Sequence, residues 1–232
     1  DRILMPREWF KEMFDYAKAK GLIVFSTIHH VEDIDFLLNL NVDVFKIASI
    51  DSNHLPLLKE VAKLNRPLII STGMTTLEEI DETVETLVKA GNKKLCLLHC
   101  VSCYPPDPHI INLNNMVMFA ERYGFPVGYS DHSISNAFSV AAVALGACVI
   151  EKHLTLSRKT RGPDHPFALE PKDMKELVFS VRDVEAALGK KERVLSKDEM
   201  AARRMIKRSI VAKRDIQKGE RLSKGMVKFS RP

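Results

Sequence analysis

The sequence of 232 residues lacks several features that would place it in particular protein classes. No apolar stretch approaches the roughly 20 residues that a membrane-spanning helix needs, and no signal-peptide pattern is visible. No Gly-rich dinucleotide-binding fingerprint follows any predicted strand, which disfavours a doubly wound open sheet. With 45% apolar and 28% charged residues, the composition is that of a soluble globular protein. We therefore expect a soluble protein without a membrane partner.

Only four cysteines are present, and three of them have a spacing that needs a separate test. Cys96, Cys100 and Cys103 match the Cys-x3-Cys-x2-Cys spacing of radical enzymes that hold an iron–sulfur cluster. Cys96, however, lies inside the apolar run 95–98, whereas a cluster ligand should lie on a loop. Ser102 also stands before the last cysteine, where that motif usually has an aromatic residue. A radical iron–sulfur enzyme therefore stays an alternative but is disfavoured. Without a cluster, the cysteines are expected to be reduced thiols in a cytoplasmic protein.

Positive charge is concentrated near the end of the sequence. Residues 190–232 contain 15 Lys and Arg against 5 Asp and Glu, whereas the 189 residues before them contain 20 against 25. A basic segment of this kind can bind nucleic acid. Apolar residues are interspersed here, however, as in a segment that packs against protein. We therefore expect it to dock on an acidic surface, its own or a partner's, and expect no nucleic-acid partner.

Short apolar runs alternate with amphipathic segments along the first 189 residues. Six runs are predicted to be buried parallel strands, at residues 22–26, 44–47, 67–71, 94–99, 126–129 and 147–150. The clearest helix spans residues 76–90, where Thr75 and Glu78 are predicted to form the capping box. Such alternation is typical of a TIM-type β/α barrel, which has eight strands. Two strands and a helix are therefore expected to be absent from the N-terminal side.

Polar side chains recur where the predicted strands end, which is where β/α barrels carry their chemistry. Hydroxyl groups and one lysine are the groups expected to bind a phosphate or a phosphorylated carboxylate. These residues are Thr27, Lys46, Ser49, Ser71, Ser102, Tyr104 and Ser130. Each Ser or Thr could instead only cap the helix that follows it. A lone strand lysine also suits a Schiff-base aldolase, so that interpretation of Lys46 stays open.

Two histidines and a carboxylate follow the last two predicted strands. Alternation along a strand places Glu151 and His153 on one side and Lys152 on the other. If the two runs are neighbouring parallel strands, His132 and His153 converge at one edge of the sheet. Two imidazoles and a carboxylate can form an open catalytic divalent-metal site, although strand-end histidines are often only hydrogen-bonded. Asp131, beside His132, is a further candidate catalytic carboxylate.

Six motifs occur in the order and spacing of the N-acetylneuraminate (sialic acid) synthase family, which includes legionaminic and pseudaminic acid synthases. They are FKIAS at 45–49, ISTGM at 70–74, LHC at 98–100 with YP at 104–105, GYSDH at 128–132, EKH at 151–153 and GPD at 162–164. Residues 208–212 and 215–220 resemble the linker and the opening of that family's antifreeze-like (SAF-type) domain. The resemblance implies a barrel domain at 1–189, a linker at 190–208 and the start of an antifreeze-like domain at 209–232.

The resemblance also implies a reaction. Members of the family condense phosphoenolpyruvate with an N-acetylated amino-hexose, such as N-acetylmannosamine, to a nine-carbon 2-keto sugar acid, and they release phosphate by C–O cleavage. A divalent metal assists, typically manganese, with magnesium or cobalt as alternatives. By matching position, His132 and His153 are similar to the metal ligands, and Glu151 to the acid–base or water-orienting carboxylate.

Substrate contacts follow from the same matching. Tyr104 and Asp164 resemble residues that bind the sugar, and Ser102 stands where relatives can have asparagine. The positions that resemble phosphoenolpyruvate contacts are Thr27, Lys46, Ser49, Ser71 and Ser130. Full-length members are expected to be domain-swapped homodimers, in which the antifreeze-like domain contributes an arginine to the partner's site.

The sequence departs from the family pattern in three ways. The first two barrel strands, which bring a glutamate, a lysine and a glutamine to the site, have no counterpart. Residues 28–30 are Ile-His-His where Pro-Phe is common, and the antifreeze-like domain stops early. We therefore expect this polypeptide to have weak or no activity, and a non-catalytic binding fragment stays an alternative.

Overall fold

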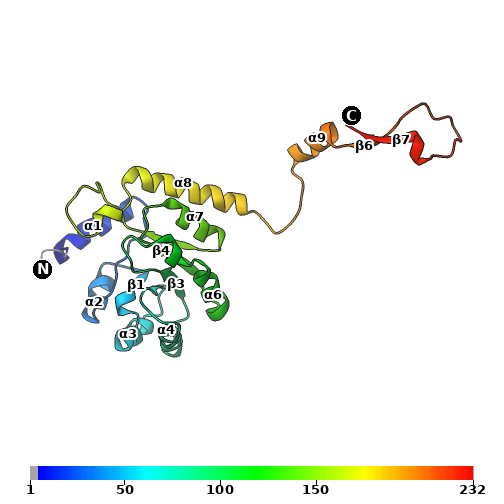
Figure 1. Cartoon of the computed structure of the whole chain (residues 1–232). Helices are drawn as coiled ribbons and strands as arrows, with labels where there is room; N and C mark the ends of the chain where they lie inside the picture. The colour runs from blue at the N-terminus through cyan, green and yellow to red at the C-terminus, as the bar shows by residue number, and fades with distance from the viewer. Residues whose placement is uncertain (1–4, 232) are drawn as a thin grey trace. The chain divides into compact units, whose positions relative to one another are not determined.

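Five parallel strands form the sheet of the first unit in this computed structural model, which describes residues 5–231. The strands are hydrogen-bonded to one another in chain order, and the sheet curls as part of a barrel (Figure 1). They are β1 (Phe45–Ile47), β2 (Leu68–Ser71), β3 (Leu95–Cys100), β4 (Val127–Asp131) and β5 (Val149–Lys152). The predicted class, a β/α barrel with a parallel sheet, is confirmed.

Helices follow the strands and surround the sheet (Figure 1). Helix α6 packs on β3 and β4, and α7 packs on β4 and on α8. The α-helices of this unit are α1 (Arg7–Ala19), α2 (Glu32–Asn39), α3 (Leu55–Lys63), α4 (Leu77–Lys89), α5 (Pro108–Ile111), α6 (Asn114–Tyr123), α7 (Asn136–Ala144) and α8 (Pro171–Leu188). Two short 3-10 turns, at Ser49–Asp51 and His165–Phe167, lie in the loops after β1 and β5.

One row of apolar side chains fixes which face of the sheet is buried. Ile47, Ile70, Leu97 and Val127 are paired across β1 to β4, and all four are buried. Burying a side chain of this size contributes about 1.5–3 kcal/mol. A slip of one residue would exchange this row with the opposite face, so the core determines which polar side chains point inward at the strand ends.

The first of the six predicted strands is not a strand in the structure. Residues 22–26 lie outside any ladder, and Leu22 and Ile23 are largely exposed. Pairing with β1 is limited to a bridge between Thr27 and Lys46, where the Ile28 N–H donates to the Lys46 carbonyl. Burial begins only at Ile28, which is fully buried, so apolar composition alone was a misleading signal.

The capping box of α4 lies one residue later than predicted. Thr76 Oγ1 accepts a hydrogen bond from the Glu79 N–H, and Glu79 Oε2 accepts one from the Thr76 N–H at 2.8 Å. The prediction of Thr75 and Glu78 was wrong, because the Thr75 hydroxyl donates to the Gly73 carbonyl in the preceding turn.

The second unit comprises Gly189–Pro232. It contains α9 (Lys197–Ile206) and an antiparallel pair, β6 (Ser209–Ala212) with β7 (Val227–Ser230), preceded by a 3-10 turn at Lys224–Met226. A capping box between Ser196 and Glu199 begins α9. Across residues 5–231, no helix is both long and apolar enough to cross a membrane.

Candidate functional site

A pocket of about 210 Å³ lies at the carboxyl ends of the strands. The register explains why it forms, because Cys100, Ser130 and Glu151 are paired across β3, β4 and β5 and carry their side chains to the same face. Eight of the twelve lining residues are predicted site residues. The lining consists of Lys46, Ala48, Ser49, Ile50, Ser71, Met74, Cys100, Ser102, Tyr104, Ser130, His132 and Glu151.

An ion pair crosses the floor of this pocket. Lys46 Nζ lies 3.2 Å from Glu151 Oε2, and the Ser130 hydroxyl donates to Glu151 Oε1 at 2.6 Å. The Lys46 side chain is only 8% exposed, whereas that of Glu151 is 39% exposed. Both carboxylate oxygens of Glu151 therefore have a partner, while part of its side chain stays open to the pocket. The buried charge of Lys46 is compensated by this carboxylate.

Hydroxyl groups from three strand ends surround the lysine. Ser49 Oγ accepts the Gly73 N–H at 2.9 Å, and Ser102 Oγ lies 3.9 Å from Cys100 Sγ. Ser71 Oγ is buried and has no hydrogen-bond partner among residues 5–231. A buried hydroxyl without a partner costs about 1–3 kcal/mol, so Ser71 is free to bond to a polar ligand in the pocket.

The two imidazoles lie side by side at one end of the pocket. The ring centroids of His132 and His153 are 5.3 Å apart, and His132 Nδ1 lies 3.0 Å from the Val101 carbonyl oxygen. A proton on Nδ1 that donates to this carbonyl leaves Nε2 free, as at most metal-binding histidines. Burial, and then the neighbouring His132, lower the pKa of His153, which favours the neutral ring that binds metals.

The donor set fits a metal with few protein ligands. Within residues 5–231, no group of three or more His, Cys, Asp or Glu side chains could hold a metal ion. The adjacent rings of His132 and His153 are the imidazoles that could hold a cation, whose other positions would belong to water or substrate. Such an open set is typical of catalytic metals rather than structural ones.

Aromatic rings close the histidine end of the pocket. The Tyr104 ring lies 4.3 Å from the His132 ring and 5.2 Å from that of Phe167, which is also 5.1 Å from His153. Partial burial, and then nearby Cys100, raise the pKa of Tyr104, so its phenol can donate a hydrogen bond. Phe167 was not predicted, because its loop has neither strand nor helix periodicity.

Four predicted site residues lie outside the pocket lining, and one of them, His153, lies beside the lining residue His132. Thr27 lines a neighbouring hollow of about 650 Å³, next to Lys46. Asp164 lies at the rim, with its side chain 62% exposed and Oδ2 3.8 Å from His153 Nδ1, too far for a hydrogen bond. The side chain of Asp131 is on the opposite face of β4 and does not reach the pocket.

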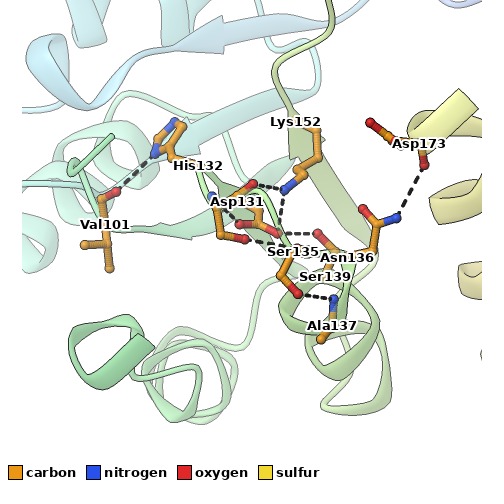
Figure 2. A network of polar contacts seen from close by, with 10 residues as sticks. Val101, Asp131, His132, Ser135, Asn136, Ala137, Ser139, Lys152 and Asp173 are labelled. Atoms are coloured by element: carbon orange, nitrogen blue, oxygen red, sulfur yellow. Dashed lines mark hydrogen bonds and ion pairs between the residues drawn. The ribbon is translucent and has the colours of Figure 1, made fainter. Parts of the chain in front are cut away.

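Asp131 instead forms a buried polar network (Figure 2). Lys152 Nζ lies 3.0 Å from Asp131 Oδ2, and Ser139 Oγ of α7 donates to the same oxygen at 2.6 Å. Burial lowers the pKa of Lys152, and the charge of Asp131 opposes that effect. The alternation of side chains along a strand predicted which face of the sheet carries Lys152. Its partner, Asp131, follows only from the register between β4 and β5.

The cysteines do not gather as a cluster site would require. Cys96 Sγ lies 3.9 Å from Cys148 Sγ, at the opposite end of β3 from the pocket. Cys100 lines the pocket, and Cys103 is exposed. Their positions do not support the iron–sulfur alternative.

Family models and known proteins match this chain over most of its length. A model of the NeuB family matches residues 1–193, and a SAF domain model matches residues 207–232. The chain is 42% identical to the N,N'-diacetyllegionaminic acid synthase of Campylobacter jejuni, over 96% of this chain and 67% of that protein. It is 39% identical to the human N-acetylneuraminate-9-phosphate synthase, over 94% of this chain and 61% of that protein.

A solved structure is also similar to this chain, in fold and in sequence. The N-acetylneuraminic acid (sialic acid) synthetase of Leptospira borgpetersenii matches with a TM-score of 0.79 and 31% identity, over 85% of this chain and 69% of that one. The chain therefore spans 61–69% of the length of these three similar proteins.

Proposed function

The chain belongs to the NeuB family, and from this premise we propose that its pocket serves the condensation of phosphoenolpyruvate with an N-acetylated amino-hexose. The product is a nine-carbon 2-keto sugar acid of the sialic acid type, and phosphate is released. One observation carries the proposal. A buried lysine, several strand-end hydroxyls, a carboxylate and two adjacent imidazoles line or border a single pocket.

Phosphoenolpyruvate carries a carboxylate and a phosphate, so its site needs cations and hydrogen-bond donors. Lys46 supplies the charge, and its low exposure strengthens the interaction with an anion. Ser49 and Ser102 lie around it, and the unpartnered Ser71 hydroxyl gains a hydrogen bond when an anion binds. Thr27 is bridged to Lys46 through the backbone, which supports its proposed contact with the same ligand.

His132 and His153 would hold the divalent cation, manganese or else magnesium or cobalt. When bound, the cation would supply Lewis-acid polarisation of the sugar aldehyde. Glu151 accepts hydrogen bonds and is partly exposed, so it can orient the water that attacks C2 and take its proton. C3 of phosphoenolpyruvate bonds to the aldehyde carbon, whose oxygen takes up a proton, and the water oxygen bonds to C2. The C2–O bond to phosphate then breaks, the C2 hydroxyl loses its proton to give the 2-keto group, and phosphate leaves with the bridging oxygen.

The sugar would occupy the aromatic end of the pocket. The Tyr104 phenol can donate to a sugar oxygen, and the exposed Asp164 carboxylate can accept from sugar hydroxyls. The two named synthases make different sugar acids, so assays with several N-acetylated amino-hexoses are needed to identify the acceptor.

Binding is the first test, because this chain is expected to turn over slowly. Calorimetry with phosphoenolpyruvate and MnCl2 should show binding that Lys46→Met weakens at least about 10-fold, since a charge-assisted contact contributes about 1.5–3 kcal/mol. Lys11→Met is the matched control, because Lys11 forms an exposed ion pair with Asp15 on α1. Equal affinity in the wild type and in Lys46→Met would contradict the proposal.

Turnover is the second test. Phosphoenolpyruvate labelled with ¹⁸O in the C–O–P bridge should yield labelled phosphate only when both sugar and metal are present, because the C–O bond breaks. Unlabelled phosphate would indicate P–O cleavage and a different reaction.

A further inference from the structure

The strand ends that carry the proposed metal site are joined on their outer face by a buried ion pair (Figure 2). In the register of β4 and β5, Asp131 is paired with Lys152, one position after the pair of Ser130 and Glu151. Side chains alternate, so the Ser130–Glu151 pair faces the pocket and the Asp131–Lys152 pair faces α7. The exposed fractions of the Asp131 and Lys152 side chains are 0% and 3%.

Both partners also hold the backbone next to the first histidine. Asp131 Oδ1 accepts the Ser133 N–H at 2.8 Å, and Lys152 Nζ donates to the Ser133 carbonyl at 2.5 Å. Ser139 links the same carboxylate to α7. The chain on both sides of His132 is therefore fixed. Lys152 is in turn the last residue of β5 and stands between Glu151 and His153 in the sequence.

We propose that the Asp131–Lys152 pair positions the inward-facing His132, Glu151 and His153 in the arrangement that binds the cation. This inference rests on the proposed function of the pocket. Neither partner reaches the pocket, so both are positioning residues and not catalytic ones. Apolar residues of similar volume could fill the same space without loss of stability. They could not bond to both the N–H and the carbonyl of Ser133, and those directional bonds fix the orientation.

The first experiment needs no ligand. Asp131→Val combined with Lys152→Met removes both charges and both side-chain bonds to Ser133, so no buried charge is left without a partner. In the metal-free chain with ¹⁵N-labelled histidine, we expect the ring signals of His132 and His153 to shift and the signal of His132 to lose its fixed tautomer. The signal of His54, which is exposed and precedes α3, should stay unchanged.

A destabilised control separates positioning from stability. Leu87→Ala creates a cavity on α4, where Leu87 is fully buried and remote from both histidines. It should lower Tm and leave the ring signals in place. Ser139→Ala is a milder variant that keeps the ion pair, and we expect smaller shifts in the same two signals. If the double variant does not fold, the ring signals of Ser139→Ala decide whether the Asp131–Lys152 pair positions the histidines.

The second readout is Mn²⁺ affinity, measured by EPR. Loss of partners that orient metal-binding histidines typically weakens binding about 10- to 100-fold, and we expect this of the folded double variant, with wild-type affinity in Leu87→Ala. Unchanged ring signals in folded variants would overturn the positioning role. Absence of Mn²⁺ binding to the wild type would instead count against the metal in the proposed function, and the ring signals would still decide the positioning role.

Discussion

Replacing Gly73 with alanine would put a methyl group where the pocket has no room for one. Gly73 follows β2, and its N–H donates to Ser49 Oγ at 2.9 Å. An added Cβ would lie 2.2 Å from Ser102 Oγ and 2.9 Å from both Ser49 Oγ and Cys100 Sγ. Since non-bonded heavy atoms normally lie about 3.5 Å apart, the Ser102 hydroxyl must move by roughly 1 Å or the end of β2 must shift.

We expect the substitution to impair binding more than folding. Overpacking of this kind typically costs about 1–3 kcal/mol of unfolding free energy, and each kcal/mol lowers Tm by about 2–4 °C in a unit of this size. A hydrogen bond from a hydroxyl to a charged ligand contributes about 1.5–3 kcal/mol, so the displacement of one hydroxyl weakens binding about 10- to 100-fold. Because both Ser49 and Ser102 are displaced, phosphoenolpyruvate affinity should fall by about 100-fold.

Calorimetric titration with phosphoenolpyruvate, beside thermal unfolding, measures both effects. Gly91→Ala is the matched control, because Gly91 has a φ of +100° and nothing lies within 4 Å of an added Cβ. That variant should lose stability through backbone strain and keep its affinity. Wild-type affinity in Gly73→Ala would refute the inference that hydroxyls packed around this glycine bind the substrate.

Three further predictions concern single groups. Burial raises the pKa of Cys96 to about 12, so its thiolate is scarce at neutral pH, and iodoacetamide should modify the exposed Cys103 much faster, as judged by peptide mass spectrometry. Borohydride with pyruvate should leave Lys46 unmodified, because its ammonium is paired with a carboxylate, and a trapped adduct would favour the Schiff-base alternative. Thr76→Ala should cost about 1 kcal/mol in denaturant unfolding by removing a cap, whereas Thr75→Ala should not act through this cap.

The inward-facing part of the site could be predicted because it depends on local rules. Alternation along a strand is independent of the rest of the fold, so Glu151 and Lys152 were correctly assigned to opposite faces. The parallel order of the strands then brought Ser130 and His132 next to Glu151. The partner of Lys152 depends on the register between β4 and β5, which the packing of the whole unit determines, and a single sequence does not contain that information in local form.

The predicted strand at 22–26 and the predicted capping box at Thr75 were wrong, because the local sequence there is compatible with more than one structure. Residues 22–26 are as apolar as a strand, yet they form no ladder, since strand formation also needs a neighbour to pair with along its length. Thr75 and Thr76 are both suitable caps by composition. The choice between them depends on the turn after Gly73, in which Thr75 has another bonding partner.

Charge pairing at the strand ends couples the binding of the cation to the binding of the anion. Lys46 is already paired with Glu151 toward the pocket, and Lys152 with Asp131 on the opposite face of the sheet. An anion that binds Lys46 must share it with Glu151, and the two negative charges would then repel each other. A cation at His132 and His153 would offset that repulsion. Cation and anion should therefore bind with positive coupling, each raising the affinity for the other by the same factor.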